Sequence, residues 1–183
     1  SKLVGLFSYH FIQFVTTRSI TMYKAYIISL LTIFFLAQNS YAKVPIAGDA
    51  APNFSLTSVD DKKVNLADLK GKVVLIGMFH ICVPCMKQAL EFNKVQAQLS
   101  SDKLAILGIN TSGDSKAAVM KYLKGFPENV KFSYLIDPDQ SVHKNYSQRD
   151  MPTVLIIDSN GIIQARVPWV GADQLVKFLK KLL

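Results

Sequence analysis

The chain has 183 residues, a length suited to one domain plus a leader segment, and half of its residues are hydrophobic. Its formal net charge is +8, but residues 1–42 hold three of the 21 bases and no acid, so part of the basic character belongs to that segment. The remaining bases are scattered, and no basic run is interleaved with aromatic residues, which argues against a nucleic-acid partner.

Residues 1–42 are predicted to be an N-terminal leader that is removed, with a signal peptide starting at about Met22. The short basic region Met22–Lys24 precedes the apolar stretch Ala25–Ala37. That stretch is shorter than the about 20 residues that a membrane-spanning helix needs, so cleavage is favoured over a permanent anchor. Ser40-Tyr41-Ala42 supplies the small residues of a cleavage site. A membrane-associated N-terminal helix is the alternative. The predicted location is periplasmic or otherwise extracytoplasmic.

Residues 43–183 are predicted to form one domain. The apolar run Lys72–Phe79 is typical of a strand covered on both faces. In Pro84–Leu99 apolar residues recur every three or four positions, which predicts a helix. The other predicted elements are strands at 54–57, 104–109, 132–136, 153–157 and 162–167, and helices at 115–124, 139–146 and 172–183, with a hairpin turn at Asp158–Gly161.

The predicted order alternates strands with helices and closes on a hairpin and a last helix. Alternating βαβ units imply parallel strands with right-handed crossovers, and the hairpin adds antiparallel neighbours. The predicted fold class is therefore α/β, with a mixed central sheet and helices on both of its faces.

The two cysteines, Cys82 and Cys85, stand where the predicted central strand ends and the first long helix begins. A disulfide across so short a loop adds little stability through loop closure, so a purely structural role is poorly motivated. At a helix N-terminus, unpaired N–H groups and the macrodipole favour an anion by about 0.3–1 kcal/mol. This lowers the pKa of the Cys82 thiol toward neutrality. Pro84 fits this position because an N–H is not needed in the first helical turn.

These features predict a thiol–disulfide exchange mechanism. Cys82 attacks a substrate disulfide, a mixed disulfide forms, and the more shielded Cys85 resolves it. The redox group is then the Cys82–Cys85 couple itself, and neither a further cofactor nor a metal is expected.

Met151-Pro152-Thr153 stands just before a predicted strand. Pro152 is a candidate for a cis peptide bond, and the backbone of Met151 is expected to bind an incoming extended peptide as an added strand. The alternative is an ordinary trans proline at the start of a strand.

His80 precedes Cys82 by two residues and is a candidate for tuning its thiol. If the strand continued that far, both side chains would lie on one face. A protonated His80 would then lower the pKa of Cys82 and make the disulfide more oxidising. A solvated or backbone-bonded histidine is the alternative. His143 and His10 show no partner pattern.

Three other conspicuous residues receive structural interpretations. Trp169 is expected in core or rim packing. Asp137 and Asp139 flank Pro138 and are expected to be turn residues.

Six segments of the chain together carry a family resemblance: Ala51–Leu56, Leu69–Ile76, Cys82–Cys85, Asp137–Asp139, Met151–Thr153 and Asp158–Gly161. They resemble the TlpA/ResA branch of the thioredoxin-like, redoxin-like proteins. The resemblance implies an extracytoplasmic thioredoxin-like fold, Cys-x-x-Cys disulfide chemistry and a cis-proline loop beside the cysteines. It also implies reduction of substrate proteins that carry disulfides, as in cytochrome c biogenesis, and re-reduction by a membrane electron donor.

Three positions depart from that family pattern. Ile81 replaces the usual tryptophan before the first cysteine. Gln88 stands where reductases of this branch often carry an acid, and Ile76 stands where cytosolic thioredoxins keep a buried acid. Proton transfer to and from Cys85 therefore needs another route.

Two other functions use the same residues. A copper-binding or delivery module would hold Cu(I) between Cys82 and Cys85, whereas a closed zinc site lacks its four ligands. A thiol peroxidase is the second alternative, but peroxiredoxins place a hydroxyl residue where this chain has Phe79.

Overall fold

The computed structural model of the chain describes residues 44–99 and 102–183. The predicted leader, its cleavage site and the start of the predicted domain at residue 43 lie outside the described residues. Within the described ranges, no helix combines the length and the apolar character needed to cross a membrane.

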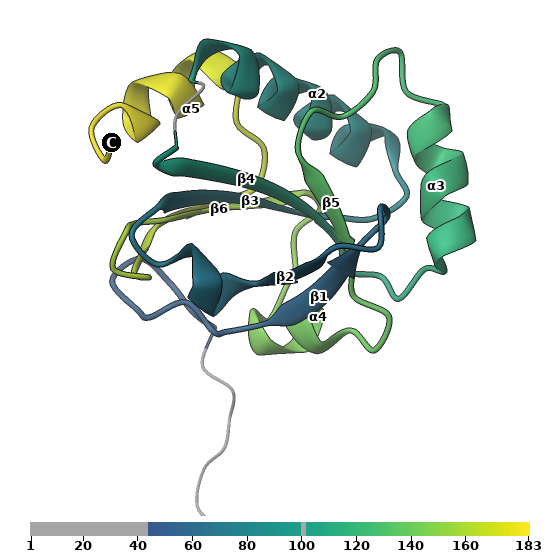
Figure 1. The fold of residues 1–183 in the computed structure, drawn as a ribbon, viewed down its shortest axis with the longest axis horizontal. Helices are drawn as coiled ribbons and strands as arrows, with labels where there is room; N and C mark the ends of the chain where they lie inside the picture. Colours follow the sequence, from purple (N-terminus) through teal and green to yellow (C-terminus); the bar gives the residue numbers. More distant parts are fainter. Residues whose placement is uncertain (1–43, 100–101) are drawn as a thin grey trace, which may run out of the picture. The chain divides into compact units, whose positions relative to one another are not determined.

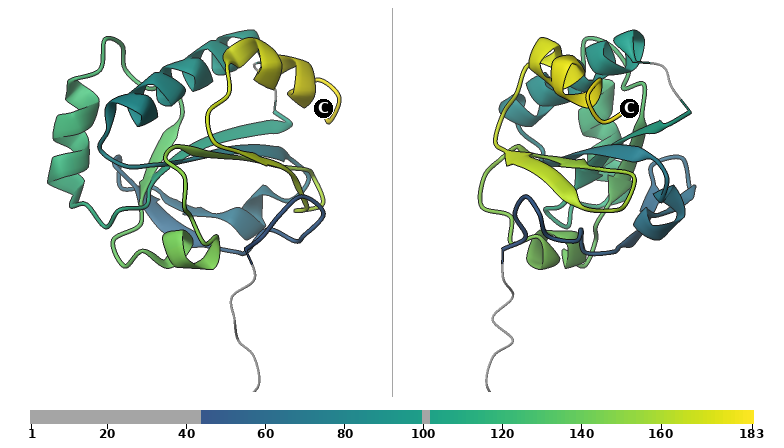
Figure 2. Two further views of the ribbon diagram at one scale, coloured as in Figure 1. Left: turned by 180° about the vertical axis from the view of Figure 1, so that it is seen from behind. Right: turned by 90° about the vertical axis from the view of Figure 1, so that its left-hand side faces the viewer.

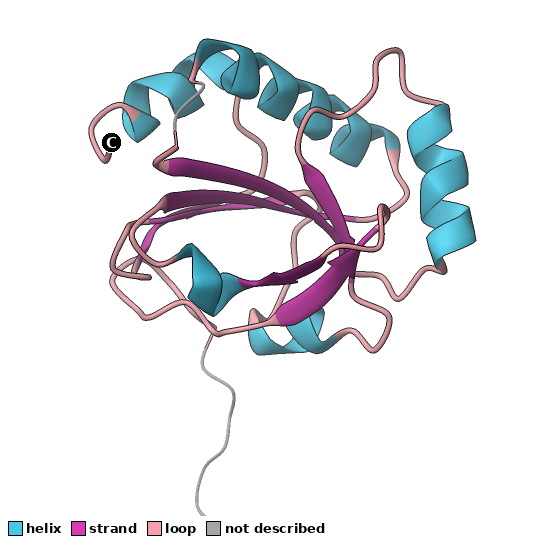
Figure 3. Ribbon diagram, in the orientation of Figure 1, coloured by secondary structure: helices cyan, strands magenta, loops and turns pink. Residues whose placement is uncertain are grey.

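Seven strands and five helical segments follow one another along the described chain (Figure 3). The strands are β1 (Ser55–Ser58), β2 (Lys63–Asn65), β3 (Val73–Phe79), β4 (Leu104–Asn110), β5 (Ser133–Ile136), β6 (Thr153–Ile157) and β7 (Ile163–Val167). The helices are the 3-10 turn η1 (Leu66–Leu69) and α2 (Val83–Gln98), α3 (Lys116–Lys124), α4 (Ser141–Asn145) and α5 (Ala172–Leu179). The sequence patterns missed β2 and η1, and the last helix ends at Leu179 rather than at Leu183.

All seven strands join one mixed sheet in the order β2-β1-β5-β4-β3-β6-β7. β3 pairs in parallel with β4, β4 pairs in parallel with β5, and β6 and β7 form the predicted antiparallel hairpin (Figure 1). Since β6 is antiparallel to β3, the residues that precede β6 lie at the same end of the sheet as the residues that follow β3. The predicted α/β fold class is confirmed.

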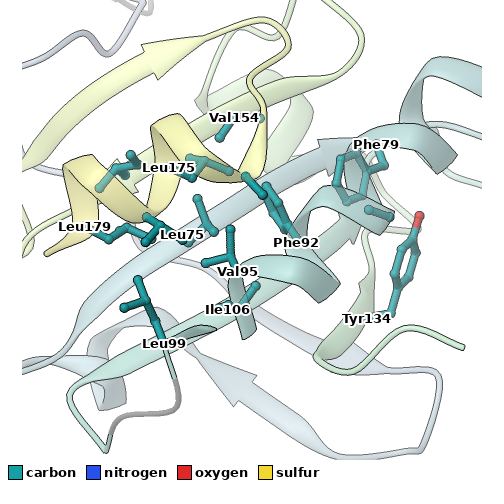
Figure 4. Packing of buried hydrophobic residues seen from close by; sticks show 14 of the residues in the cluster. Leu75, Phe79, Phe92, Val95, Leu99, Ile106, Tyr134, Val154, Leu175 and Leu179 are labelled. Carbon is teal, nitrogen blue, oxygen red and sulfur yellow. The ribbon is translucent and has the colours of Figure 1, made fainter. Parts of the chain in front are cut away.

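Helices cover both faces of the sheet, as Figures 1 and 2 show: α2 and α5 lie on one face and α4 lies on the other. The side chains of β3 alternate between these layers. Leu75 and Phe79 point into the core beneath α2 and α5, whereas Ile76 and Met78 join the core beneath α4 and η1. Figure 4 shows the first core, where Leu75 and Phe79 pack with residues of α2 and α5.

Helix α2 carries two buried amide side chains in addition to its apolar stripe. Gln88 is bound to the segment between β7 and α5, and Asn93 is bound to the segment between α3 and β5. Asn93 donates to the carbonyl of Asn129 at 2.9 Å and accepts from the N–H of Lys131 at 2.8 Å. The helix is therefore fixed on two sides by hydrogen bonds as well as by burial.

Candidate active site

Cys82 and Cys85 form a disulfide at the start of α2, with their Cα atoms 5.3 Å apart. Cys82 is the N-cap of the helix: its backbone is extended, and its sulfur accepts a hydrogen bond from the N–H of Cys85 at 3.3 Å. Pro84 occupies the first turn, where it displaces no helical hydrogen bond. The free N–H groups of the helix therefore point toward the first cysteine, as the sequence predicts.

The two sulfurs differ in their access to solvent. Cys82 is partly buried, whereas Cys85 is 1% exposed, and the Cys85 sulfur accepts the backbone N–H of His80 at 3.3 Å. Cys82 is consequently the residue that an external thiol or disulfide reaches. Cys85 is the shielded partner that the resolving role requires.

Tyr122, on α3, supports the first cysteine from the side. Its hydroxyl donates to the carbonyl of Cys82 at 2.6 Å, and its ring makes an edge contact with Phe126 at 4.8 Å. Burial raises the pKa of the Tyr122 hydroxyl, so it remains a donor. No sequence pattern predicts this contact, because α3 and α2 are brought together only by the fold.

The Met151–Pro152 peptide bond is cis, and the prediction made from the sequence is confirmed. The β3–β6 register ends at the pair Met78–Thr153, so Met151, two residues before Thr153, lies at the end of the sheet where β3 leads into His80. Pro152 is buried, but Met151 is half exposed, as are Ile81 and Val83 on either side of Cys82. An apolar surface, formed by Ile81, Val83 and Met151, thus lies at the disulfide end of the sheet.

His80 does not share a strand face with Cys82, because β3 ends at Phe79 and the backbone bends before Cys82. Its ring instead lies 6.3 Å, centroid to centroid, from that of His143 on α4. Among the described residues, the Nε2 atom of His80 and the Nδ1 atom of His143 are buried and have no hydrogen-bond partner. Burial, and then the neighbouring His143, lower the pKa of His80, against a smaller opposing effect of Asp114. The sequence shows no partner pattern for His143, because only the fold brings it beside His80.

Gln88 is completely buried and makes two hydrogen bonds with Val170. Its Nε2 donates to the Val170 carbonyl, and its Oε1 accepts the Val170 N–H, both at 2.8 Å. Ile76 is buried in the core on the other face of the sheet. Neither position offers an ionisable group to Cys85.

The two aspartates near α4 are turn residues, as the sequence predicts, and their carboxylates also accept N–H groups of α4. Asp137 is fully buried, and its carboxylate accepts the N–H groups of Val142 and His143 at 2.9 and 3.1 Å. Asp139 accepts the N–H of Ser141, and this bond lowers the pKa of Asp139. Trp169 lies at the rim and is 53% exposed. Within residues 44–99 and 102–183, no three histidine, cysteine or acidic side chains are grouped as a metal site requires.

Comparison with known proteins gives consistent matches over this domain. The family model described as Redoxin matches residues 46–168. The thiol-disulfide oxidoreductase ResA of Bacillus subtilis (strain 168) is 32% identical over 130 residues, which cover 70% of this chain and 71% of that protein. ResA of Bacillus thuringiensis subsp. konkukian is 30% identical over 137 residues, covering 74% of this chain and 78% of that protein.

Solved structures show the same fold. A crystal structure of a thiol:disulfide interchange protein DsbE from Chlorobium tepidum superposes with a TM-score of 0.64 at 27% identity, covering 75% of this chain and 95% of that one. The pneumococcal exposed lipoprotein thioredoxin of Streptococcus pneumoniae superposes with a TM-score of 0.61 at 25% identity, covering 72% of this chain and all of that one.

Proposed function

The chain belongs to the Redoxin family and is a thiol–disulfide oxidoreductase of the ResA type, and from that premise we propose that it reduces disulfide bonds of partner proteins outside the cytoplasm. The observation that carries the proposal is the unequal pair at the start of α2: a reachable Cys82 at the N-cap and a buried Cys85 behind it.

The reaction begins with the reduced protein. The Cys82 thiolate attacks one sulfur of the substrate disulfide, breaks that bond, and forms a mixed disulfide while the other substrate sulfur leaves as a thiolate. Cys85 then loses its proton and attacks the Cys82 sulfur. The intramolecular disulfide forms, the second substrate thiolate leaves, and two electrons have passed from the cysteine pair to the substrate. The disulfide itself is the only redox group that this scheme needs.

Substrate docking is assigned to the apolar surface of Ile81, Val83 and Met151. An extended peptide bound along the backbone of Met151 gains main-chain hydrogen bonds by strand addition, and the exposed apolar side chains accommodate its neighbours. Because main-chain bonds are independent of sequence, this mode suits several substrate proteins, apocytochrome c among them.

The cellular setting follows from the leader and from the chemistry. A signal peptide in residues 1–42 delivers the domain to the periplasm or an equivalent extracytoplasmic compartment. Reductive turnover there needs a source of electrons, and we assign this role to a membrane electron donor that reduces the Cys82–Cys85 disulfide.

The test uses the purified domain. A Cys85→Ser variant is expected to accumulate a mixed disulfide with a disulfide-bonded protein such as insulin, detected by intact mass, whereas Cys82→Ser forms none. The reduction potential, measured against glutathione, is expected at about −200 to −270 mV. A potential near about −120 mV, typical of a strong oxidant, contradicts the reducing direction. Unchanged exchange by Cys82→Ser contradicts the mechanism itself.

A further inference from the structure

The shielded cysteine needs a proton acceptor, and the two positions at which a carboxylate would be expected offer none. When Cys85 attacks the mixed disulfide, its thiol must first become a thiolate, and Cys85 is 1% exposed. A buried thiolate without a stabilising partner is costly, so the proton has to leave to a group close by. Ile76 and Gln88 cannot accept it, because neither side chain ionises.

His80 contacts the Cys85 sulfur through its backbone. Its N–H donates to the sulfur at 3.3 Å, which fixes the histidine beside the shielded cysteine. Its Nε2 atom is buried and has no hydrogen-bond partner among the described residues. In the tautomer protonated on Nδ1, this nitrogen holds a free lone pair.

His143 is the second histidine of the arrangement and lies beside the ring of His80. It lies on α4, its ring is 6.3 Å from that of His80, and its own Nδ1 is likewise buried without a partner in the described structure. Its backbone N–H donates to Asp137, which fixes its backbone at the start of α4. Two imidazoles so close together repel each other when both carry a proton.

We propose that His80, paired with His143, is the base that takes the proton of Cys85 in the resolving step. This inference rests on the proposed function and assigns it a proton route. The Cys85 S–H bond breaks, the proton moves to the imidazole of His80 directly or through one water molecule, and the Cys85 thiolate forms the bond to Cys82. The His80 imidazolium then releases its proton to solvent and returns to its neutral form. The departing substrate thiolate takes up a proton from solvent, so the proton count balances.

The charged surroundings of His80 agree with this role. His143 on α4 and Asp114 on the segment between β4 and α3 act on its ring, and its backbone N–H donates to the sulfur of Cys85 on α2. Arg149 and Asp150, on the segment before β6, interact with Arg166. Burial and His143 lower the pKa of His80, so the ring is neutral at pH 7 and ready to accept. Once Cys85 has lost its proton, the thiolate favours the imidazolium.

The test separates the two steps of the reaction. A mixed disulfide between Cys82 and a reporter thiol is prepared on the wild-type protein and on His80→Asn, His80→Gln and His143→Asn variants. Its resolution by Cys85 is followed as release of the reporter thiol between pH 5 and pH 9. Alkylation of Cys82 by iodoacetamide measures the first step separately, and circular dichroism verifies folding.

The wild-type resolution rate is expected to rise through an inflection below pH 6.5, where His80 becomes neutral. Both His80 variants are expected to lose this inflection and to resolve about 10- to 100-fold more slowly at pH 7, with Cys82 alkylation unchanged. His143→Asn removes the repulsion on His80, so the inflection is expected to move to higher pH.

Two outcomes overturn the inference: His80 variants that resolve at the wild-type rate with the wild-type profile, or a His143→Asn profile that does not move. Both leave the proposed function intact. A wild-type protein that forms no mixed disulfide at all refutes the proposed function instead.

Discussion

The ring of Phe79 occupies the space that a side chain on Gly77 would fill: a Cβ atom added there would lie 2.1 Å from the Cζ atom of Phe79. Both residues belong to β3 and face the same side of the sheet, beneath α2. Phe79 in turn contacts Phe92 and stacks on Tyr134, at centroid distances of 5.8 and 6.0 Å. The absence of a side chain at residue 77 therefore sets the packing directly behind the disulfide.

Gly77→Ala is expected to destabilise the domain by about 1–3 kcal/mol, because the buried Phe79 ring has to move out of its place. Urea unfolding measures the loss. The matched experiment repeats the substitution in a Phe79→Leu background, where the smaller side chain leaves room and the cost is expected to shrink. Equal costs in the two backgrounds contradict the assigned contact.

Gln88→Leu is expected to cost about 2–3 kcal/mol, since the N–H and the carbonyl of Val170 both lose their partner. Gln88→Glu tests the same contact through pH. A buried carboxyl keeps both bonds only when protonated, so its pKa in the folded protein is raised above the unfolded value. The unfolding free energy of this variant is therefore expected to lie closest to wild type below about pH 4 and to decline as pH rises.

Glu91 caps the N-terminus of α5. Removing its side chain is expected to destabilise the domain only at pH values at which the carboxyl group is ionised. Its carboxylate accepts the N–H of Ala172 at 2.7 Å and the amine of Lys94 at 2.6 Å. Burial acts to raise the pKa of Glu91, but these hydrogen bonds outweigh it and hold the pKa below its ordinary value.

Because the folded-state pKa is depressed, the stabilisation is present above the unfolded value and is lost as pH falls through the folded one. Glu91→Ala is expected to cost about 1 kcal/mol at pH 7 and much less at pH 3. Glu128→Ala, which removes an exposed pair with Lys131, is the control and is expected to stay within about 0.5 kcal/mol at either pH. A deficit for Glu91→Ala that is the same at both pH values refutes the cap.

Met151→Asp is expected to raise the KM for a disulfide-bonded protein substrate several-fold, because a charge replaces an exposed apolar contact on the docking surface. Turnover of a small aromatic disulfide, which needs no such surface, is expected to remain near wild type. Ile46→Asp is the matched control: Ile46 is equally exposed, but it lies on the segment before β1 and is not one of the three residues of the docking surface. If both substitutions change KM alike, the docking surface is wrongly placed.

The main elements and the disulfide site followed from local sequence patterns. The uninterrupted apolar run of β3, the three-and-four spacing in α2 and the turn at Asp158–Gly161 each carry a strong signal, and the cysteines stand at the junction of the first two. The cis bond at Pro152 is predictable because a proline directly before a strand is either a candidate for a cis peptide bond or an ordinary trans proline at the strand start.

The features that the sequence does not predict are a short strand at the edge of the sheet and contacts between residues far apart in the chain. β2 is three residues long and pairs only with β1 at the edge of the sheet, so Lys63–Asn65 shows too little alternation to register. The bond from Tyr122 to Cys82 and the approach of His143 to His80 join residues 40 and more than 60 positions apart. Periodicity within a single sequence describes local structure and does not predict contacts between residues so far apart.

The two buried amides of α2 have a consequence for the conditions in which the protein works. Gln88 and Asn93 anchor the helix to the segments on either side of it, and an amide neither gains nor loses a proton across the range of acidity in which proteins remain folded. A carboxyl group in either place would gain or lose a proton as the pH changed, and its hydrogen bonds to these segments would change with it. If the domain acts outside the cytoplasm, as proposed, these two anchors of the helix that carries the cysteines keep their hydrogen bonds while the thiol chemistry responds to pH.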